Sequence, residues 1–313
     1  MKYPDQLEIK PLAGPPVASV RVPGSKSITN RALVLAALTS KGFATALRGA
    51  LRSEDTEVMV EALRALGFRV LTEWPENAVF VSSGQEEPTI PARGADLYVA
   101  NSGTTMRFLT ALVALGQGRF RLDGVPRMRE RPIGHLLDAL QALGVDVQSE
   151  ANNGCPPVVV QGDGIAGGDV TIRADISSQF LSGLLMAAPC ARGDVTIRLD
   201  GPLVSWPYIF MTIRMMAAFR LQVEERITPA ESVKEELAAS ALLTGNRQEW
   251  GELIQKLPQG LSFFIRGRQY RSVEDFEGQL EKRAVRDFDP RHHVWLRDYW
   301  IEPDASAASY FFA

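Results

Sequence analysis

The sequence has few of the residues that hold small secreted or metal-stabilised proteins together. Among 313 residues there are only two cysteines, Cys155 and Cys190, and three histidines. Two cysteines provide no disulfide framework, which favours a reducing, cytoplasmic location. His292 and His293 are adjacent, but no further ligands stand at metal-binding spacing, so the sequence predicts no metal site.

Long apolar runs and an excess of charge are missing as well. No run of about 18 apolar residues is present, and Met1–Leu12 mixes charged with apolar residues, which argues against a membrane span and a signal peptide. The formal net charge of −3 disfavours nucleic acid as a partner. With 45% apolar and 23% charged residues, the composition is that of a globular protein with one large domain or two.

What the sequence does contain is a pattern that occurs three times. Ala18–Val22 alternates apolar and polar residues like a strand, Pro23–Ser25 interrupts it, and an apolar helical pattern follows from Ser27. The same order returns at residues 97–109 and 170–188. Each copy is typical of a β-α-β-α-β-β unit whose helices end at glycine.

Three serines occupy the same place in the three copies at intervals of 75 residues: Ser27, Ser102 and Ser177. This symmetry suggests that three helix N-termini converge. A fourth copy begins near Ile301, but about 54 extra residues precede it. The extra residues include two helical stretches and one charged amphipathic stretch, at 229–243, 248–257 and 274–286.

The first helix start has the chemistry of an anion site. Free N–H groups and the positive end of the helix dipole favour an anion there, and Lys26 and Arg31 add positive charge. We expect a small phosphorylated ligand, although an ordinary capped helix with solvated basic residues would look the same. A P-loop is excluded, because Ser25 separates Gly24 from Lys26.

Two further clusters support an anionic ligand. Asn101–Thr105, followed by Arg107, combines hydroxyl groups with a glycine that permits close backbone approach. Arg127, Arg129 and Arg131 precede the helix expected at 132–143, and arginine suits forked binding of phosphate or carboxylate. Taken alone, the arginine run is more typical of a solvated face, and the two phosphate-like helix starts are what favour a binding role.

Six motifs in this order resemble the 5-enolpyruvylshikimate-3-phosphate synthases of the enolpyruvyl transferase family. They are PGSKSITNRAL, NSGTTMRFL, RMRERPIGHLLDAL, SSQFLSGLLMAAP, LVSWPY and EPDASAASYFFA. The resemblance implies an α/β fold of repeated β-α-β-α-β-β units around buried parallel helices, an inside-out α/β barrel, with three units present and a fourth truncated. It places residues 1–20 with the second domain, 21–225 in a shikimate-phosphate-binding domain, 226–298 in an atypical insert with the inter-domain crossover, and 299–313 at the truncated start of the second domain.

The implied reaction transfers the enolpyruvyl group of phosphoenolpyruvate to the 5-hydroxyl of shikimate 3-phosphate and releases phosphate, in aromatic amino acid biosynthesis. The resemblance implies no cofactor, no metal, no membrane partner and a typically monomeric state. Lys26 matches a catalytic lysine that contacts both substrates. The matching shikimate 3-phosphate ligands are Lys26, Ser27, Arg31, Ser177, Ser178, Gln179, Ser205 and Tyr208. The matching phosphoenolpyruvate ligands are Lys26, Asn101, Gly103, Thr104, Arg131 and Gln179.

The chain also departs from the family. Phe108 stands where many members have proline, Trp206 stands where a small or basic residue is common, and the family's acid/base Asp and Glu would lie in the absent second domain. We therefore expect no turnover by this chain alone. A non-catalytic or split-enzyme half that binds shikimate 3-phosphate is the alternative. The UDP-N-acetylglucosamine enolpyruvyl transferases fit less well, because the loop before Pro132 lacks their cysteine.

Overall fold

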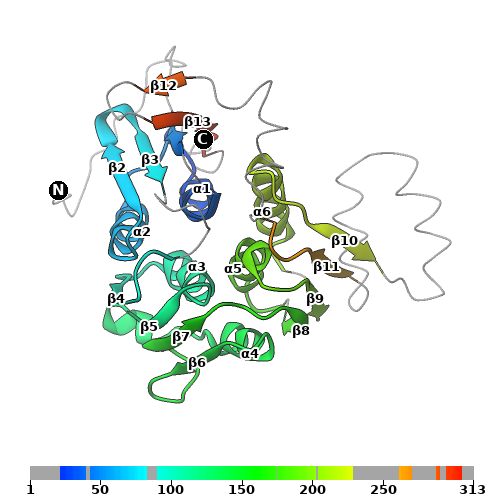
Figure 1. Cartoon of the computed structure of the whole chain (residues 1–313). Coiled ribbons are helices and arrows are strands. Elements are labelled where there is room, and N and C mark those ends of the chain that lie inside the picture. Colours follow the sequence, from blue (N-terminus) through cyan, green and yellow to red (C-terminus); the bar gives the residue numbers. More distant parts are fainter. Residues whose placement is uncertain are drawn as a thin grey trace, which may run out of the picture.

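Three β-sheets surround a group of helices in the computed structural model of the chain (Figure 1). The structure describes residues 22–39, 43–82, 90–173, 175–201, 204–227, 261–269, 287–289 and 294–304. Several predicted features lie outside these residues: residues 1–20, most of the strand at 18–22, the stretches at 229–243, 248–257 and 274–286, and His292 and His293.

The second unit follows the predicted order of strands and helices. Strands β4 and β5 are parallel and are joined by α3, and β7 and β6 then add in antiparallel fashion, giving the order β4-β5-β7-β6. The elements are β4 (Gly94–Tyr98), α3 (Gly103–Val113), β5 (Gln117–Asp123), α4 (Gly134–Ala142), β6 (Asp146–Ser149) and β7 (Val158–Asp163). Helix α4 begins two residues later than predicted, after Pro132 and Ile133.

The third unit has the same plan, in the order β8-β9-β11-β10. Its elements are β8 (Gly168–Arg173), α5 (Ser178–Ala187), β9 (Val195–Asp200), α6 (Trp206–Ala218), β10 (Glu224–Ile227) and β11 (Leu261–Ile265). Strand β11 lies within the stretch expected to be an insert, yet it pairs with both β9 and β10, and Phe263 and Ile265 are fully buried. Residues 261–265 therefore belong to the sheet and the buried core of this unit.

The first unit takes one strand from the far end of the chain. Its own strands β1, β3 and β2 are antiparallel, and β13 fills the parallel position that β4 and β8 occupy in the other units. The elements are α1 (Lys26–Thr39), β1 (Phe43–Arg48), α2 (Glu54–Ala65), β2 (Arg69–Glu73), β3 (Ala78–Ser82), β12 (Asp287–Asp289) and β13 (Val294–Trp300). Tyr299 and Trp300, expected at the start of a second domain, thus lie in the first sheet.

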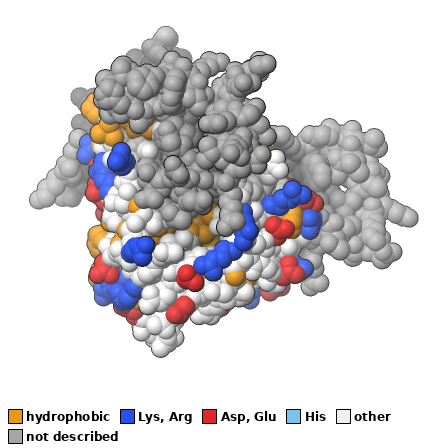
Figure 2. All heavy atoms as spheres, viewed as in Figure 1, with side chains coloured by type: hydrophobic (Ala, Val, Ile, Leu, Met, Phe, Trp, Pro, Cys, Tyr) orange, Lys and Arg blue, Asp and Glu red, His pale blue; other side chains and the backbone are white. Residues whose placement is uncertain are grey.

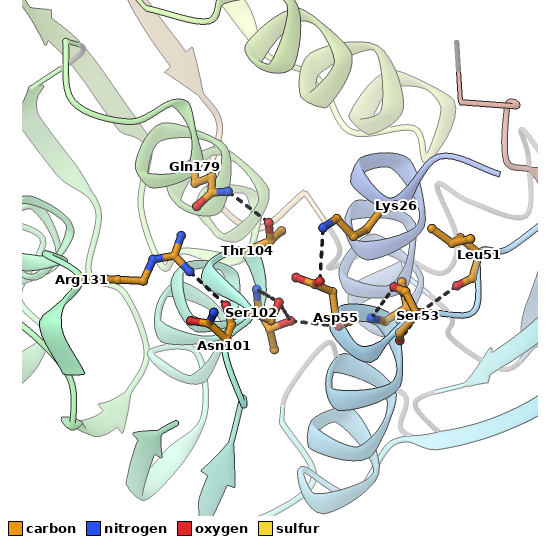
Figure 3. Close-up of polar contacts among 11 residues, drawn as sticks. Lys26, Leu51, Ser53, Asp55, Asn101, Ser102, Thr104, Arg131 and Gln179 are labelled. Carbon is orange, nitrogen blue, oxygen red and sulfur yellow. Dashed lines mark hydrogen bonds and ion pairs between the residues drawn. The ribbon is translucent and has the colours of Figure 1, made fainter. Parts of the chain in front are cut away.

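Helices α1, α3 and α5 lie between the sheets, with their N-termini at one end (Figures 1 and 3). Nearly every residue of α1 from Ile28 to Thr39 is buried, which its run of apolar residues on all sides predicts. The three equally spaced serines do not all hold the same position at their helix starts. Ser102 and Ser177 cap α3 and α5, whereas Ser27 is already the second residue of α1.

The first helix starts earlier because the chain around residue 300 holds the segment before it. Gly24 forms a bridge with Pro303, and the amide of Ser25 donates to the carbonyl of Glu302 at 3.0 Å. A Cβ on Gly24 would collide with the carbonyl oxygen of Gly49. This extended, closely packed backbone ends at Ser25, so the helix begins at Lys26.

Candidate functional site

The N-termini of α1, α2, α3 and α5 form one polar cluster (Figure 3). The ammonium of Lys26, on α1, lies 3.2 Å from a carboxylate oxygen of Asp55 on α2. The hydroxyl of Thr105 donates to the backbone carbonyl of Asp55 at 3.3 Å, and the amide of Gln179, on α5, donates to the hydroxyl of Thr104 at 3.1 Å. Four helix starts are thus linked by side chains.

Lys26 is the most exposed end of helix α1, which begins in this cluster, and it is an accessible cation. Its side chain is 48% exposed and that of Asp55 is 27% exposed. Asp55 is held in the first turn of α2, which Ser53 and Thr56 begin with a capping box. A partly exposed ion pair contributes only about 0–1 kcal/mol, so an incoming anion can compete for the ammonium.

The start of α3 and the arginine run meet at Gly103. Ser102 caps α3 by accepting the amide of Thr105 at 3.2 Å, and Arg131 donates to the carbonyl of Asn101 at 3.0 Å. A Cβ on Gly103 would collide with the guanidinium groups of Arg107 and Arg131, so a larger residue here would have to displace these side chains. This arrangement brings an arginine side chain to a helix N-terminus, where both favour an anion.

Only one member of the arginine run reaches the cluster. Arg127 pairs with Glu130, and Arg129 pairs with Asp123 at 2.7 Å, so these two arginines belong to the solvated surface. On the face drawn in Figure 2, Lys and Arg side chains alternate with Asp and Glu side chains in the same manner. Arg127 and Arg129 therefore form part of a solvated face, the alternative considered for these arginines from the sequence.

The start of α5 supplies two serines and the glutamine. Ser177 accepts the amide of Gln179 at 3.2 Å and so caps the helix, while Ser178 is buried at its first position. Gln179 is fixed by Thr104, its equivalent 75 residues earlier. The predicted residues Lys26, Asn101, Thr104, Arg131 and Gln179 thus lie in one cluster.

Arg31 lies deeper in the bundle, at 2% exposure. Its guanidinium donates to the hydroxyls of Thr212 at 2.7 Å and Ser182 at 3.1 Å, and to the carbonyl of Ser27 at 3.0 Å. Among the residues that the structure describes, no carboxylate accepts from it. Burial lowers the pKa of Arg31 to about 10, so the side chain remains charged at neutral pH.

Two aromatic rings flank the Arg31 guanidinium. Its Cζ lies 5.1 Å from the ring centroid of Phe108 and 5.8 Å from that of Tyr208. Phe108, the departure from the family's proline, therefore packs against a buried cation, which cation–π attraction favours. Tyr208 is exposed on α6, one turn after Ser205, which has a left-handed backbone at the helix start.

Sequence reasoning left Asp55 and Arg107 out of the predicted site. Asp55 follows the capping residue Ser53 in the first turn of α2, and its pairing with Lys26 depends on how α1 and α2 pack. Arg107 belongs to the second anion-binding cluster of the sequence but is not among the predicted ligands. No group of three or more His, Cys, Asp or Glu side chains able to hold a metal occurs in the described part of the chain, and none of its helices is long and apolar enough to cross a membrane.

The chain is similar to several known proteins. A profile of the family described as EPSP synthase (3-phosphoshikimate 1-carboxyvinyltransferase) matches residues 13–237. A Nostoc sp. protein named 3-phosphoshikimate 1-carboxyvinyltransferase is 40% identical over 309 residues, which is 99% of this chain and 59% of that protein. A Marinomonas sp. protein of the same name is 46% identical over 215 residues, 69% of this chain and 50% of that protein.

A solved structure shares the fold. The EPSP synthase from Acinetobacter baumannii aligns with a TM-score of 0.63 at 21% identity, over 93% of this chain and 51% of that chain. Repeated α/β units of mixed sheets around buried helices define the enolpyruvyl-transferase fold. The chain belongs to the EPSP synthase family. It spans about half the length of the curated relatives it matches.

Proposed function

We propose that the clustered N-termini of α1, α2, α3 and α5 bind shikimate 3-phosphate and phosphoenolpyruvate for enolpyruvyl transfer. The observation that carries this proposal is the meeting of Lys26, Gln179 and Arg131 at three helix starts (Figure 3). Two anionic substrates repel each other in water. Cations and N–H groups that are already in place offset this repulsion and hold the reacting groups together.

The two ligands take different sides of the cluster in this proposal. Shikimate 3-phosphate lies towards α5 and α6, and phosphoenolpyruvate lies over the start of α3. Lys26 and Gln179, between them, contact both. The shikimate 3-phosphate side has Ser27, Arg31, Ser177, Ser178, Ser205 and Tyr208, and the phosphoenolpyruvate side has Asn101, Gly103, Thr104 and Arg131.

The transfer itself begins with attack of the 5-hydroxyl oxygen of shikimate 3-phosphate on C2 of phosphoenolpyruvate, while the hydroxyl loses its proton and C3 gains one. Phosphate then leaves C2 of the tetrahedral intermediate as C3 loses a proton, which restores the carbon–carbon double bond. Lys26 can stabilise the developing charge and move one proton, but the reaction needs further acid/base groups. Among the described residues, Asp55 is the carboxylate paired with Lys26. We therefore propose that the 313-residue chain binds shikimate 3-phosphate and does not complete the reaction unaided.

Calorimetry with shikimate 3-phosphate tests the binding. Lys26→Met should weaken binding at least tenfold, about 1.4 kcal/mol, because it removes the accessible cation. Arg198→Met is the matched control, since Arg198 is an exposed cation in an ion pair with Asp169 on the third sheet. Unchanged affinity in folded Lys26→Met, or no binding by the unaltered chain, would contradict the proposal.

A turnover assay separates the alternatives. Phosphate release by the chain alone would show that it is a complete enzyme. Release that requires an added chain carrying the remaining family sequence would identify a split-enzyme half. Binding without release in either case would identify a non-catalytic binding protein.

A further inference from the structure

A second buried arginine, Arg107, lies beneath the cluster and is not among the ligands of the proposed function. Arg107, on α3, is 5% exposed. Its Nη1 donates to the carbonyl of Gly103 at 3.1 Å, and its Nη2 donates to the carbonyl of Pro132 at 3.0 Å. One guanidinium therefore ties the start of α3 to the residue that follows Arg131.

Arg107 repeats the arrangement of Arg31 on the neighbouring helix. Each donates Nη1 to the carbonyl four residues earlier, and each stacks on an aromatic ring of the next buried helix. Arg31 stacks on Phe108 at 5.1 Å, and Arg107 stacks on Phe180 at 5.6 Å. Since both side chains have the same fixed geometry, Arg107 is a built feature of the bundle and not an adaptable surface group.

The charge of Arg107 has no acidic partner in the described part of the chain, and its Nε has no hydrogen-bond partner. Burial, and after it the positive charge of Arg131, lowers the pKa of Arg107 to about 10. The group therefore stays charged at neutral pH next to a second cation. Two adjacent guanidinium groups without a carboxylate repel each other, and a bound anion relieves that repulsion.

Gly103 shows how closely the two arginines are arranged. A Cβ at this position would collide with both Nη1 of Arg107 and Nη2 of Arg131. Arg131 makes its own hydrogen bond to the carbonyl of Asn101. The position of Arg131 over the helix start therefore depends on backbone that Arg107 holds through Gly103 and Pro132.

We propose that Arg107 is a positioning residue for the phosphoenolpyruvate side of the site, fixing Arg131 above the N-terminus of α3. This inference rests on the proposed function for its ligand. Arg107 itself does not contact the ligand. It sets the geometry of the guanidinium that does, and its charge increases the attraction for the anion.

The binding test uses the full chain with shikimate 3-phosphate saturating and phosphoenolpyruvate titrated. Arg107→Met should weaken phosphoenolpyruvate binding at least fivefold and change shikimate 3-phosphate affinity less than twofold. Arg107→Lys should fall between, because lysine keeps the charge but cannot bridge both carbonyls. Arg64→Met is the matched control, since Arg64 also lies on a helix and donates to a backbone carbonyl, that of Val70, at the other end of α2.

A second readout needs no ligand. In NMR of chain labelled with ¹⁵N-arginine, the side-chain Nε–H signal of Arg131, assigned with Arg131→Lys, should lose order in Arg107→Met and keep it in Arg64→Met. An unchanged Arg131 signal would overturn the inference, as would equal loss of both ligands in a folded Arg107→Met chain. If the unaltered chain binds neither ligand but Arg131 loses order, the proposed function fails and the positioning role stands.

Discussion

Lys26 and Arg31 are cations five residues apart on one helix, and the bundle treats them in opposite ways. Lys26 is half exposed and paired with a carboxylate, whereas Arg31 is buried and paired with hydroxyls and aromatic rings. The first can exchange its partner for a ligand at little cost. The second cannot move, so its charge acts as a fixed part of the site. The comparison indicates that one residue of α1 supplies an exchangeable positive charge and another supplies a fixed one.

The largest effect is expected from Arg31→Met. Burial lowers the pKa of Arg31 to about 10, which corresponds to a cost of about 3 kcal/mol in the folded state. Because this pKa is depressed, the cost is constant below about pH 10 and is lost only as the pH rises above that value. Arg31→Met removes this cost of burying the charge. It also removes three hydrogen bonds, worth about 1 kcal/mol each, and this loss should roughly cancel the gain.

Arg31→Met should therefore change the unfolding free energy by less than about 1 kcal/mol while weakening shikimate 3-phosphate binding about a hundredfold, or about 2.7 kcal/mol. Urea unfolding and calorimetry measure the two quantities. A large fall in the unfolding free energy with unchanged shikimate 3-phosphate affinity would mean that Arg31 has only a structural role. Arg31 would then not be a fixed charge of the binding site.

An intermediate effect is expected from Arg131→Ala. Arg131 is partly exposed and donates to the carbonyl of Asn101. It is therefore more constrained than Lys26 and less constrained than Arg31. Phosphoenolpyruvate binding should weaken about tenfold, and shikimate 3-phosphate binding less than threefold. Arg131→Lys should restore little, because the forked geometry is lost. Equal loss for both ligands would indicate a folding defect.

The smallest effect is expected from Asp55→Asn. This change keeps the shape of the side chain but removes the charge that pairs with Lys26. Since the pair is partly exposed, the unfolding free energy should fall by less than about 1 kcal/mol. Shikimate 3-phosphate affinity should change less than threefold, as measured by calorimetry. A tenfold loss of shikimate 3-phosphate affinity would show that Asp55 fixes the position of Lys26, as the hydroxyls and rings around Arg31 fix that side chain.

Local patterns are sufficient to specify several of the described helices and strands. The alternation in 195–200, the capping box at Ser53 and the apolar run of α1 each specify an element without reference to the rest of the chain. The family motifs predicted Lys26, Gln179 and Arg131 in a common site. Lys26 and Gln179 lie at the starts of α1 and α5, and Arg131, from the segment before α4, donates to the carbonyl of Asn101 before α3. The chemistry of each of these residues can be read from its neighbours in sequence.

Contacts between distant segments could not be predicted in this way. The pairing of Asp55 with Lys26 depends on the packing of two helices, and Arg107 touches a carbonyl 25 residues away. The position of Ser27 inside α1 depends on Glu302 and Pro303. Strand β11 was assigned to an insert because the lengths on either side of it depart from the repeat, although its alternating burial is that of an ordinary strand.

The parallel pairing of β1 with β13 also orders events during synthesis. Arg48 and Asp298, which form an ion pair across this pairing, are 250 positions apart. At a translation rate of about 5–20 residues per second, β1 waits roughly 10 to 50 s for its neighbour to leave the ribosome. During that time one edge of β1 has unpaired backbone groups that can pair with another chain. We expect nascent chains that stop before Val294 to aggregate or to bind chaperones, whereas the second unit, which has all four of its strands by Asp163, can fold on the ribosome.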